Sequence, residues 1–251
     1  MIEARFAQTR LAETHQDLVR NIVALRAAED CFDDLSDEPA AWQAAAQLVR
    51  DTQPPRFVSA QPVIDRPFEA AAWDEALGYP FRHWLRSRYS DGSFGLWYGA
   101  DTIETSVQES VHHWRAGLLG DAGFTHPGIE IERALYRVRL DGALVDLRPA
   151  AAPFLSRVAP DDTMLTQAIG ARLHQEGHPG LVSRSARGDG DVYALLNPRV
   201  LSDPRPIGSL TYRTTVSGVA VEREPGTVWL WVDETAEKHP GRPRRTTSRG
   251  P

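Results

Sequence analysis

The residues best suited to chemistry in this 251-residue chain gather around Glu109. Apolar residues on both sides of it recur at helical spacing and predict a helix with one packing face: Ile103, Val107, Val111, Trp114 and Leu118. Glu109 lies off that face, close to Thr105, His112 and His113. It is therefore either a solvated surface glutamate or the acid of a functional site.

Spacing argues against three familiar kinds of site. Adjacent histidines such as His112 and His113 point about 100° apart on a helix, and no His-Glu-x-x-His zinc pattern is present. The chain has no Gly-x-Ser-x-Gly elbow of a serine hydrolase. It also lacks the glycine-rich loop that opens the first helix of a dinucleotide-binding Rossmann domain.

Composition narrows the class of protein further. A formal net charge of -6 argues against a protein that binds nucleic acid directly. The single cysteine, Cys31, excludes an internal disulfide and a multi-cysteine metal site. There is neither a secretory signal nor an apolar run of membrane-spanning length, so we expect no membrane association and a cytoplasmic location.

The elements that position Glu109 can be read from the neighbouring residues. Gly92 and Gly95 interrupt the chain before a short bulky run that predicts a buried strand ending at Tyr98. Asp101 precedes Glu104 by three residues, the spacing of a capping box that opens a helix. The sequence therefore predicts a loop, a strand and the Glu109 helix in succession.

Further elements follow from periodicity and turn residues. Residues 135–140 alternate as in a strand, and Asp141-Gly142 predicts a hairpin turn into residues 143–147. Asp161 or Asp162 is expected to cap a helix that ends near residue 176. The later strands are predicted at residues 181–182, 192–196, 210–216, 219–223 and 227–232.

The N-terminal part is predicted to be helical. Residues 9–30 and 39–50 carry apolar stripes at helical spacing and suggest a helical hairpin, and residues 68–77 suggest a short helix. We divide the chain into an N-terminal helical extension (1–53), a main domain (54–235) and a disordered basic tail (236–251).

Four blocks, in the same order, resemble the RES domain family, which is named for its Arg, Glu and Ser residues. Residues 56–68 resemble its opening segment, and residues 88–113 its loop, strand and glutamate helix, with Ser106 where alanine is usual. Residues 136–147 resemble the strand pair that follows. Residues 167–187 resemble the helix, glycine and Ser-x-Arg block.

This resemblance implies an α+β fold like that of ADP-ribosyltransferases, with a mixed central sheet and flanking helices, here preceded by the N-terminal helical hairpin. It also implies an enzyme that breaks NAD at the nicotinamide–ribose bond, with water or phosphate as acceptor. NAD would be the substrate, and neither a metal nor a further cofactor is expected. The family's catalytic residues correspond to Glu109, Tyr98, Ser185 and Arg56, and its NAD-binding arginines to Arg88 and Arg187.

The residue types suit these implied roles. Guanidinium groups bind pyrophosphate through paired charge-assisted hydrogen bonds. A carboxylate such as Glu109 stabilises the positive charge that develops on ribose. Tyr98 offers an aromatic face to nicotinamide, and Ser185 a hydroxyl to the ribose or carboxamide. Arg56, Arg66 and Arg88 all precede Glu109, and we place the family's first arginine at Arg56.

The resemblance also implies a toxin with a cognate Xre-like antitoxin that carries a DNA-binding domain. The antitoxin would cover the cleft, and the toxin could form a homodimer within the complex. Two alternatives stay open on the residues alone. One is an enzyme that transfers ADP-ribose to a protein, and the other is a non-catalytic interaction protein with the same fold.

Overall fold

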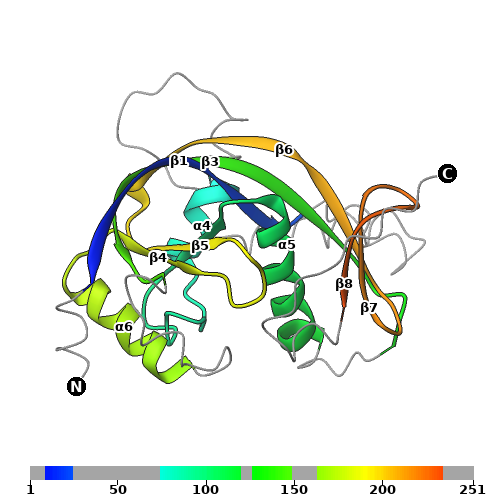
Figure 1. Ribbon diagram of the computed structural model, residues 1–251, viewed down its shortest axis with the longest axis horizontal. Helices are drawn as coiled ribbons and strands as arrows, with labels where there is room; N and C mark the ends of the chain where they lie inside the picture. Colours follow the sequence, from blue (N-terminus) through cyan, green and yellow to red (C-terminus); the bar gives the residue numbers. More distant parts are fainter. Residues whose placement is uncertain (1–8, 25–73, 120–125, 149–162, 234–251) are drawn as a thin grey trace, which may run out of the picture.

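The computed structural model describes residues 9–24, 74–119, 126–148 and 163–233, which form an α+β fold around one mixed sheet (Figure 1). The strands of this described part are β1 (Arg10–Val23), β2 (Trp97–Ala100), β3 (Glu130–Asp146), β4 (Gly180–Arg184), β5 (Asp191–Leu195), β6 (Leu201–Thr214), β7 (Gly218–Glu224) and β8 (Thr227–Asp233). Its helices are a π-helical turn (Asp74–Gly78) that runs into α4 (Tyr79–Arg82), α5 (Ile103–His112) with its π-helical extension (His113–Leu119), α6 (Thr163–Gln175) and a 3-10 turn (Pro198–Val200). No helix within these ranges is long and apolar enough to cross a membrane.

Five of the strands form a closed circuit of pairings. The sheet order is β1-β2-β5-β4-β3-β6-β7-β8, and β1 pairs with β3 as well as with β2. The circuit therefore runs from β1 through β2, β5, β4 and β3 back to β1, while β6, β7 and β8 extend the sheet from β3. Only β3 and β4 pair in parallel, and the other described pairings are antiparallel.

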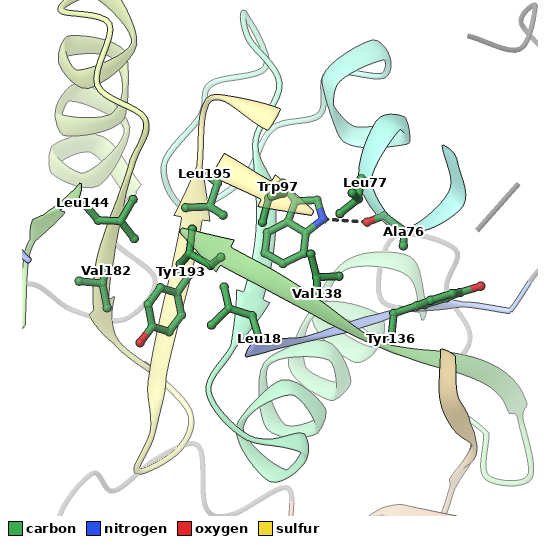
Figure 2. Packing of buried hydrophobic residues seen from close by; sticks show 12 residues of the cluster. Leu18, Ala76, Leu77, Trp97, Tyr136, Val138, Leu144, Val182, Tyr193 and Leu195 are labelled. Atoms are coloured by element: carbon green, nitrogen blue, oxygen red, sulfur yellow. Dashed lines mark hydrogen bonds between the residues drawn. The ribbon is translucent and has the colours of Figure 1, made fainter. Parts of the chain in front are cut away.

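Three apolar clusters fill the fold. The first lies among the strands of the circuit, where Trp97 is fully buried and donates its indole N–H to the carbonyl of Ala76 at 2.7 Å (Figure 2). The second packs α5 against β6 and β7, and the third packs α6 against β3, β4 and β5. Each fully buried leucine in these clusters stabilises the fold by roughly 2 kcal/mol.

The predicted helix at residues 9–30 is wrong, because β1 occupies residues 10–23. β1 pairs with β3 along its whole length, from Arg10 opposite Asp146 to Val23 opposite Arg133. Residues 39–50, the other helix of the predicted hairpin, lie outside the described residues. So does the predicted tail at 236–251.

The predicted hairpin turn at Asp141-Gly142 is also wrong, because β3 continues through both residues as one strand. Gly142 lies opposite Thr14 of β1, and the ring of His15 contacts the carboxylate of Asp141 at 2.9 Å. A long partner strand on one side keeps the chain extended where a local turn motif predicts a reversal.

Two helix boundaries differ from the predictions as well. The helix expected to stop before Gly78 continues as α4 to Arg82. The residue that caps α5 is Thr102 rather than Asp101. The strand that ends near Tyr98, the Glu109 helix, the helix at α6 and the meander of β6, β7 and β8 are confirmed.

Candidate active site

Glu109 lies on α5, which is positioned by its cap and by its apolar face. Thr102 Oγ1 accepts a hydrogen bond from the backbone N–H of Thr105 at 3.1 Å and begins the helix. Val107 and Val111 are buried in the cluster between α5 and β6–β7. With that face fixed, Glu109 lies half-buried on another side of the helix.

The turn between β4 and β5 lies directly against that side of α5. Its ends are joined by a hydrogen bond from the N–H of Ser185 to the carbonyl of Gly190 at 2.9 Å. A Cβ atom at Gly190 would overlap Thr105 Oγ1 and the Asp101 carboxylate, whereas one at Gly188 would meet only the end of the flexible Gln108 side chain. Glycine at position 190 therefore allows the turn to approach the helix.

Ser185 and Glu109 meet where the turn touches the helix. Ser185 Oγ donates to Glu109 Oε1 at 2.5 Å, and the N–H of Ala186 donates to the same oxygen at 3.0 Å. Ser185 Oγ itself accepts from the N–H groups of Arg187 at 3.1 Å and Gly188 at 2.9 Å. A hydroxyl has one proton and two lone pairs, so its proton is directed to Glu109.

A second contact joins the same turn to the same helix. The guanidinium of Arg187 lies 2.7 Å from His112 Nε2. Guanidinium nitrogens only donate, so His112 accepts through an unprotonated Nε2. The turn thus contacts α5 both at Glu109 and one turn further along, at His112.

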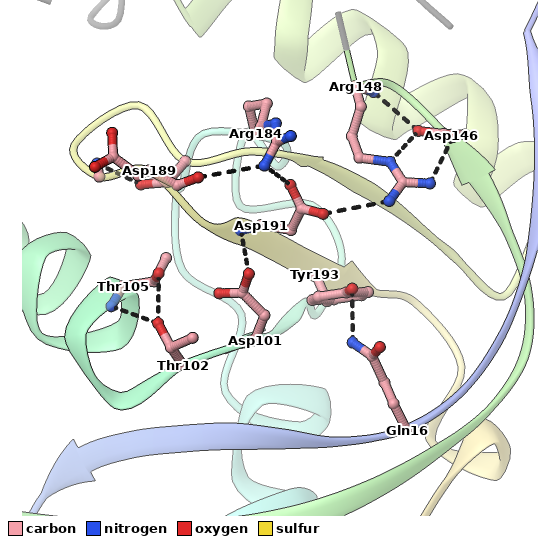
Figure 3. Close-up of polar contacts among 12 residues, drawn as sticks. Gln16, Asp101, Thr102, Thr105, Asp146, Arg148, Arg184, Asp189, Asp191 and Tyr193 are labelled. Carbon is pink, nitrogen blue, oxygen red and sulfur yellow. Dashed lines mark hydrogen bonds and ion pairs between the residues drawn. The ribbon is translucent and has the colours of Figure 1, made fainter. Parts of the chain in front are cut away.

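Charged residues fix the ends of this turn (Figure 3). The N–H of Asp191 donates to Asp101 Oδ2 at 2.9 Å, which ties the start of β5 to the residue before α5. Arg148 lies between Asp146, at 2.8 Å, and Asp191, at 3.3 Å. Its hydrogen bonds hold the pKa of Asp146 below the ordinary value. Arg184 also lies 3.0 Å from Asp191.

Tyr98 belongs to a separate polar group, formed with the loop that precedes β2. Its hydroxyl lies 2.9 Å from Ser87 Oγ and accepts from the N–H of Tyr89 at 3.2 Å. Gln167 of α6 donates to the carbonyls of Ser87 and Ser90 and holds this loop in place. Burial raises the pKa of Tyr98, so the hydroxyl stays protonated at neutral pH.

Arg20 of β1 was missed by the sequence prediction. It donates to the carbonyl of Tyr98 at 2.7 Å, and its guanidinium lies 5.3 Å from the centre of the Trp97 ring. Burial and then the charge of Arg133 lower the pKa of Arg20 to about 9. The alternation of apolar and polar residues that marks a strand is broken in β1. Three of its inward-facing positions are polar, namely Thr14, Gln16 and Arg20.

The structure thus brings together three of the six predicted site residues: Glu109, Ser185 and Arg187. Arg88 belongs to the Tyr98 group, with its guanidinium 5.9 Å from the ring centre of Tyr89. Within the described ranges no hydrogen bond connects the two groups. Arg56, like Arg66, lies outside these ranges.

A shallow cavity of about 260 Å³ opens at the start of α5. Its polar lining is mainly acidic, with Asp17, Asp101 and Glu104 facing one arginine, Arg137. An anionic ligand is disfavoured there, and the cavity does not include Glu109 or Ser185. In the part of the chain that the structure describes, no three His, Cys, Asp or Glu side chains are grouped to hold a metal ion.

The fold and this site define an α+β protein in which Glu109 on α5 accepts a hydrogen bond from Ser185 in the turn between β4 and β5. The model of the RES domain matches residues 61–215, more than half of the chain, and the chain belongs to the RES domain family. No curated protein matches. Among solved structures, a chain of the M. tuberculosis MbcT–MbcA toxin–antitoxin complex is similar, with 15% identity over 83% of this chain and 90% of that chain and a TM-score of 0.43.

Proposed function

We propose that this protein is an NAD-degrading enzyme that breaks the bond between nicotinamide and ribose. The observation that carries the proposal is the Glu109 carboxyl group, oriented by the Ser185 hydroxyl and the Ala186 N–H, with Arg187 two residues beyond the serine. NAD presents a positively charged nicotinamide ribose at one place and an anionic pyrophosphate at another. An oriented carboxylate and a nearby guanidinium match those two charges.

Glu109 would act as an electrostatic stabiliser. Cleavage of the glycosidic bond places positive charge on the ribose ring, and a carboxylate fixed beside the ring lowers the energy of that state. The two donors on Oε1 hold the group in one orientation before the substrate arrives. Ser185 is then a positioning residue, because its proton is already directed to Glu109.

The remaining residues would bind the substrate. Arg187, with Arg88 and Arg56, would bind the pyrophosphate. Tyr98 would offer its aromatic face to nicotinamide and would not act as an acid or base, because its hydroxyl binds Ser87 and Tyr89 and its pKa is raised. The bond electrons leave with neutral nicotinamide, and water or phosphate attacks the ribose carbon.

In the cell the enzyme would act as a toxin that depletes cytoplasmic NAD. Membership of the RES family supports this role. A cognate Xre-like antitoxin with a DNA-binding domain would neutralise it by covering the cleft, in a complex that can contain a homodimer of the toxin. We propose, as part of the same function, that the fold is similar to that of ADP-ribosyltransferases.

The deciding experiment measures free nicotinamide released from NAD by the purified protein, with and without phosphate. We expect release by the native chain and a loss of about 100-fold or more in Glu109→Gln. Glu104→Gln is the matched control, because Glu104 is an exposed glutamate on the same helix. Dependence on phosphate separates phosphorolysis from hydrolysis.

Folded protein that releases no nicotinamide would contradict the proposal. Radiolabel from NAD appearing on a protein would instead identify an enzyme that transfers ADP-ribose. Binding of a partner without either reaction would identify a non-catalytic interaction protein.

A further inference from the structure

We infer that Tyr212 of β6, held by Asn21 of β1, is a positioning residue that sets the rotation of α5 about its own axis and so directs Glu109 toward Ser185. The role of Glu109 in breaking NAD rests on the proposed function. The contacts that fix α5 do not depend on that function.

A line of hydrogen bonds joins the two strands to α5. The side-chain amide of Asn21 donates to the Tyr212 hydroxyl at 2.8 Å and to Ser110 Oγ at 3.2 Å. The hydroxyls of Tyr212 and Ser110 lie 2.8 Å apart. Ser110 directly follows Glu109 on α5, so the strands hold the helix immediately beside the proposed catalytic acid.

Arg133 of β3 determines which way the Asn21 amide faces. Its Nε donates to Asn21 Oδ1 at 2.9 Å, and its Nη2 donates to the Asn21 backbone carbonyl at 2.8 Å. A guanidinium only donates, so it takes the amide oxygen and leaves the amide nitrogen to the hydroxyls of Tyr212 and Ser110. Arg133 and Tyr212 are both buried, so these hydrogen bonds are protected from competition by water.

The apolar face of α5 alone would define its rotation loosely. Burial of Val107 and Val111 has no preferred direction, whereas a hydrogen bond requires a particular distance and angle. Successive helical residues are about 100° apart, so Ser110 lies between the apolar face and Glu109. A rotation that carried Glu109 away from Ser185 would also separate Ser110 from Tyr212. It would leave the buried tyrosine hydroxyl poorly paired, which costs free energy.

The test compares nicotinamide release by Tyr212→Phe and Tyr193→Phe. Tyr193 is a buried tyrosine of β5 that accepts a hydrogen bond from Gln16 of β1 at 2.7 Å (Figure 3). Each variant keeps its ring and loses one hydroxyl, so both should have a lower melting temperature. Only Tyr212→Phe should lower kcat, by about tenfold with little change in the KM for NAD, because Glu109 acts in the transition state.

Ser110→Ala tests the helix side of the same contact. It removes the other hydroxyl of the pair and should lower kcat to a similar extent. The variant that combines Ser110→Ala with Tyr212→Phe should lose little more than either single variant, because both substitutions break one hydrogen bond. Losses of kcat that multiply would contradict a shared path to Glu109.

A native kcat in Tyr212→Phe, or an equal loss of kcat in Tyr193→Phe, would overturn the inference. A readout without NAD separates this failure from that of the proposed function. The Ala186 N–H donates to Glu109, so its NMR signal should shift in Tyr212→Phe and keep its position in Tyr193→Phe. An unshifted Ala186 signal in Tyr212→Phe contradicts the positioning role, whereas native protein that releases no nicotinamide contradicts the proposed function.

Discussion

At the scale of single residues, the decisive feature is how Ser185 distributes its hydrogen bonds. The two N–H groups of Arg187 and Gly188 take its lone pairs, and the proton goes to Glu109. A hydroxyl bound in this way is a poor nucleophile, because the two N–H groups occupy both of its lone pairs. The serine therefore serves to orient the acid.

Replacing Ser185 by alanine should lower nicotinamide release by roughly 10- to 100-fold, because Glu109 loses one of its two donors. The fold should survive, since the Ala186 N–H still reaches Glu109. Steady-state kinetics with a thermal melt on the same sample checks both statements. Ser217→Ala in the exposed turn before β7 is the control, and equal activity in the two variants would contradict the role given to Ser185.

The resemblance to the RES family, and not residue types alone, selected Glu109, Ser185 and Arg187 from separate blocks of sequence. In the structure they lie within hydrogen-bonding range of one another or of the same helix. His112 was considered only as a zinc ligand, because a contact to a turn more than 70 residues later leaves no local pattern. Arg20 was missed because it lies among polar inward-facing positions of β1, and its partner is a backbone carbonyl on β2.

At the scale of elements, the turn from β4 to β5 requires glycine where it meets α5. In Gly190→Ala, the added methyl would collide with Thr105 Oγ1 and with the Asp101 carboxylate. We expect a melting temperature several degrees lower and reduced activity, from a cost of about 2 kcal/mol. In Gly128→Ala nothing lies within 4 Å of the new methyl, but the φ of +93° strains the backbone, so this control should lose stability and keep its activity. Equal losses of activity in Gly190→Ala and Gly128→Ala would show that the turn tolerates the displacement caused by the methyl at position 190.

The arginine network at the end of β3 leads to a prediction about pH. The pKa of Asp146 lies below its ordinary value of 3.8, chiefly because Arg148 donates to it. The stabilisation is therefore complete above the unfolded-state pKa and is lost as pH falls through the lower, folded-state pKa. Asp146→Asn should cost about 1 kcal/mol at pH 7, a modest value because Arg148 is partly exposed.

Urea unfolding at pH 7 and at pH 3 measures this effect. The difference in free energy of unfolding between native and Asp146→Asn should shrink at the lower pH. Asp203→Asn serves as the control, because Asp203 is a more exposed carboxylate that also contacts an arginine. A difference that is constant across pH would argue that packing, and not charge, is lost at Asp146.

Short elements were predicted well and long strands poorly. α5, α6, β4, β5, β7 and β8 have caps, turns or alternation within a few residues of themselves. The 14-residue β6 was predicted only from residue 210 onward. β1 and the continuous β3 stabilise each other through 14 paired positions, and each alone suggests something else. Leu11, Leu18 and Ile22 fit a helical stripe, and Asp141-Gly142 fits a turn, until the partner strand is present.

At the scale of the whole molecule, the sheet extends beyond the region that matches the RES model. Residues 61–215 omit β1, which pairs with β3 along 14 positions, and omit β7 and β8. Such a fragment leaves one side of β3 unpaired and uncovers the cluster that packs against α5. We expect it to be unfolded or aggregated.

Circular dichroism and analytical ultracentrifugation of residues 61–215 test this prediction. Residues 1–233, which keep every described strand, serve as the comparison and should melt cooperatively. A monomeric, cooperatively melting 61–215 fragment would show that β1, β7 and β8 are dispensable additions to the fold.

The pairing of β1 with β3 also determines when the chain can fold during its synthesis. His15 and Asp141, which meet in this pairing, are separated by 126 residues of sequence, so closing the circuit is a slow, non-local step. A ribosome adds roughly 5–20 residues per second, and β1 must wait many seconds for its partner strand to emerge. Glu109 likewise meets Ser185 only after the β4–β5 turn has left the ribosome. For the proposed enzyme, the growing chain would be inactive until this turn has emerged, and the proposed antitoxin would have that interval in which to be present.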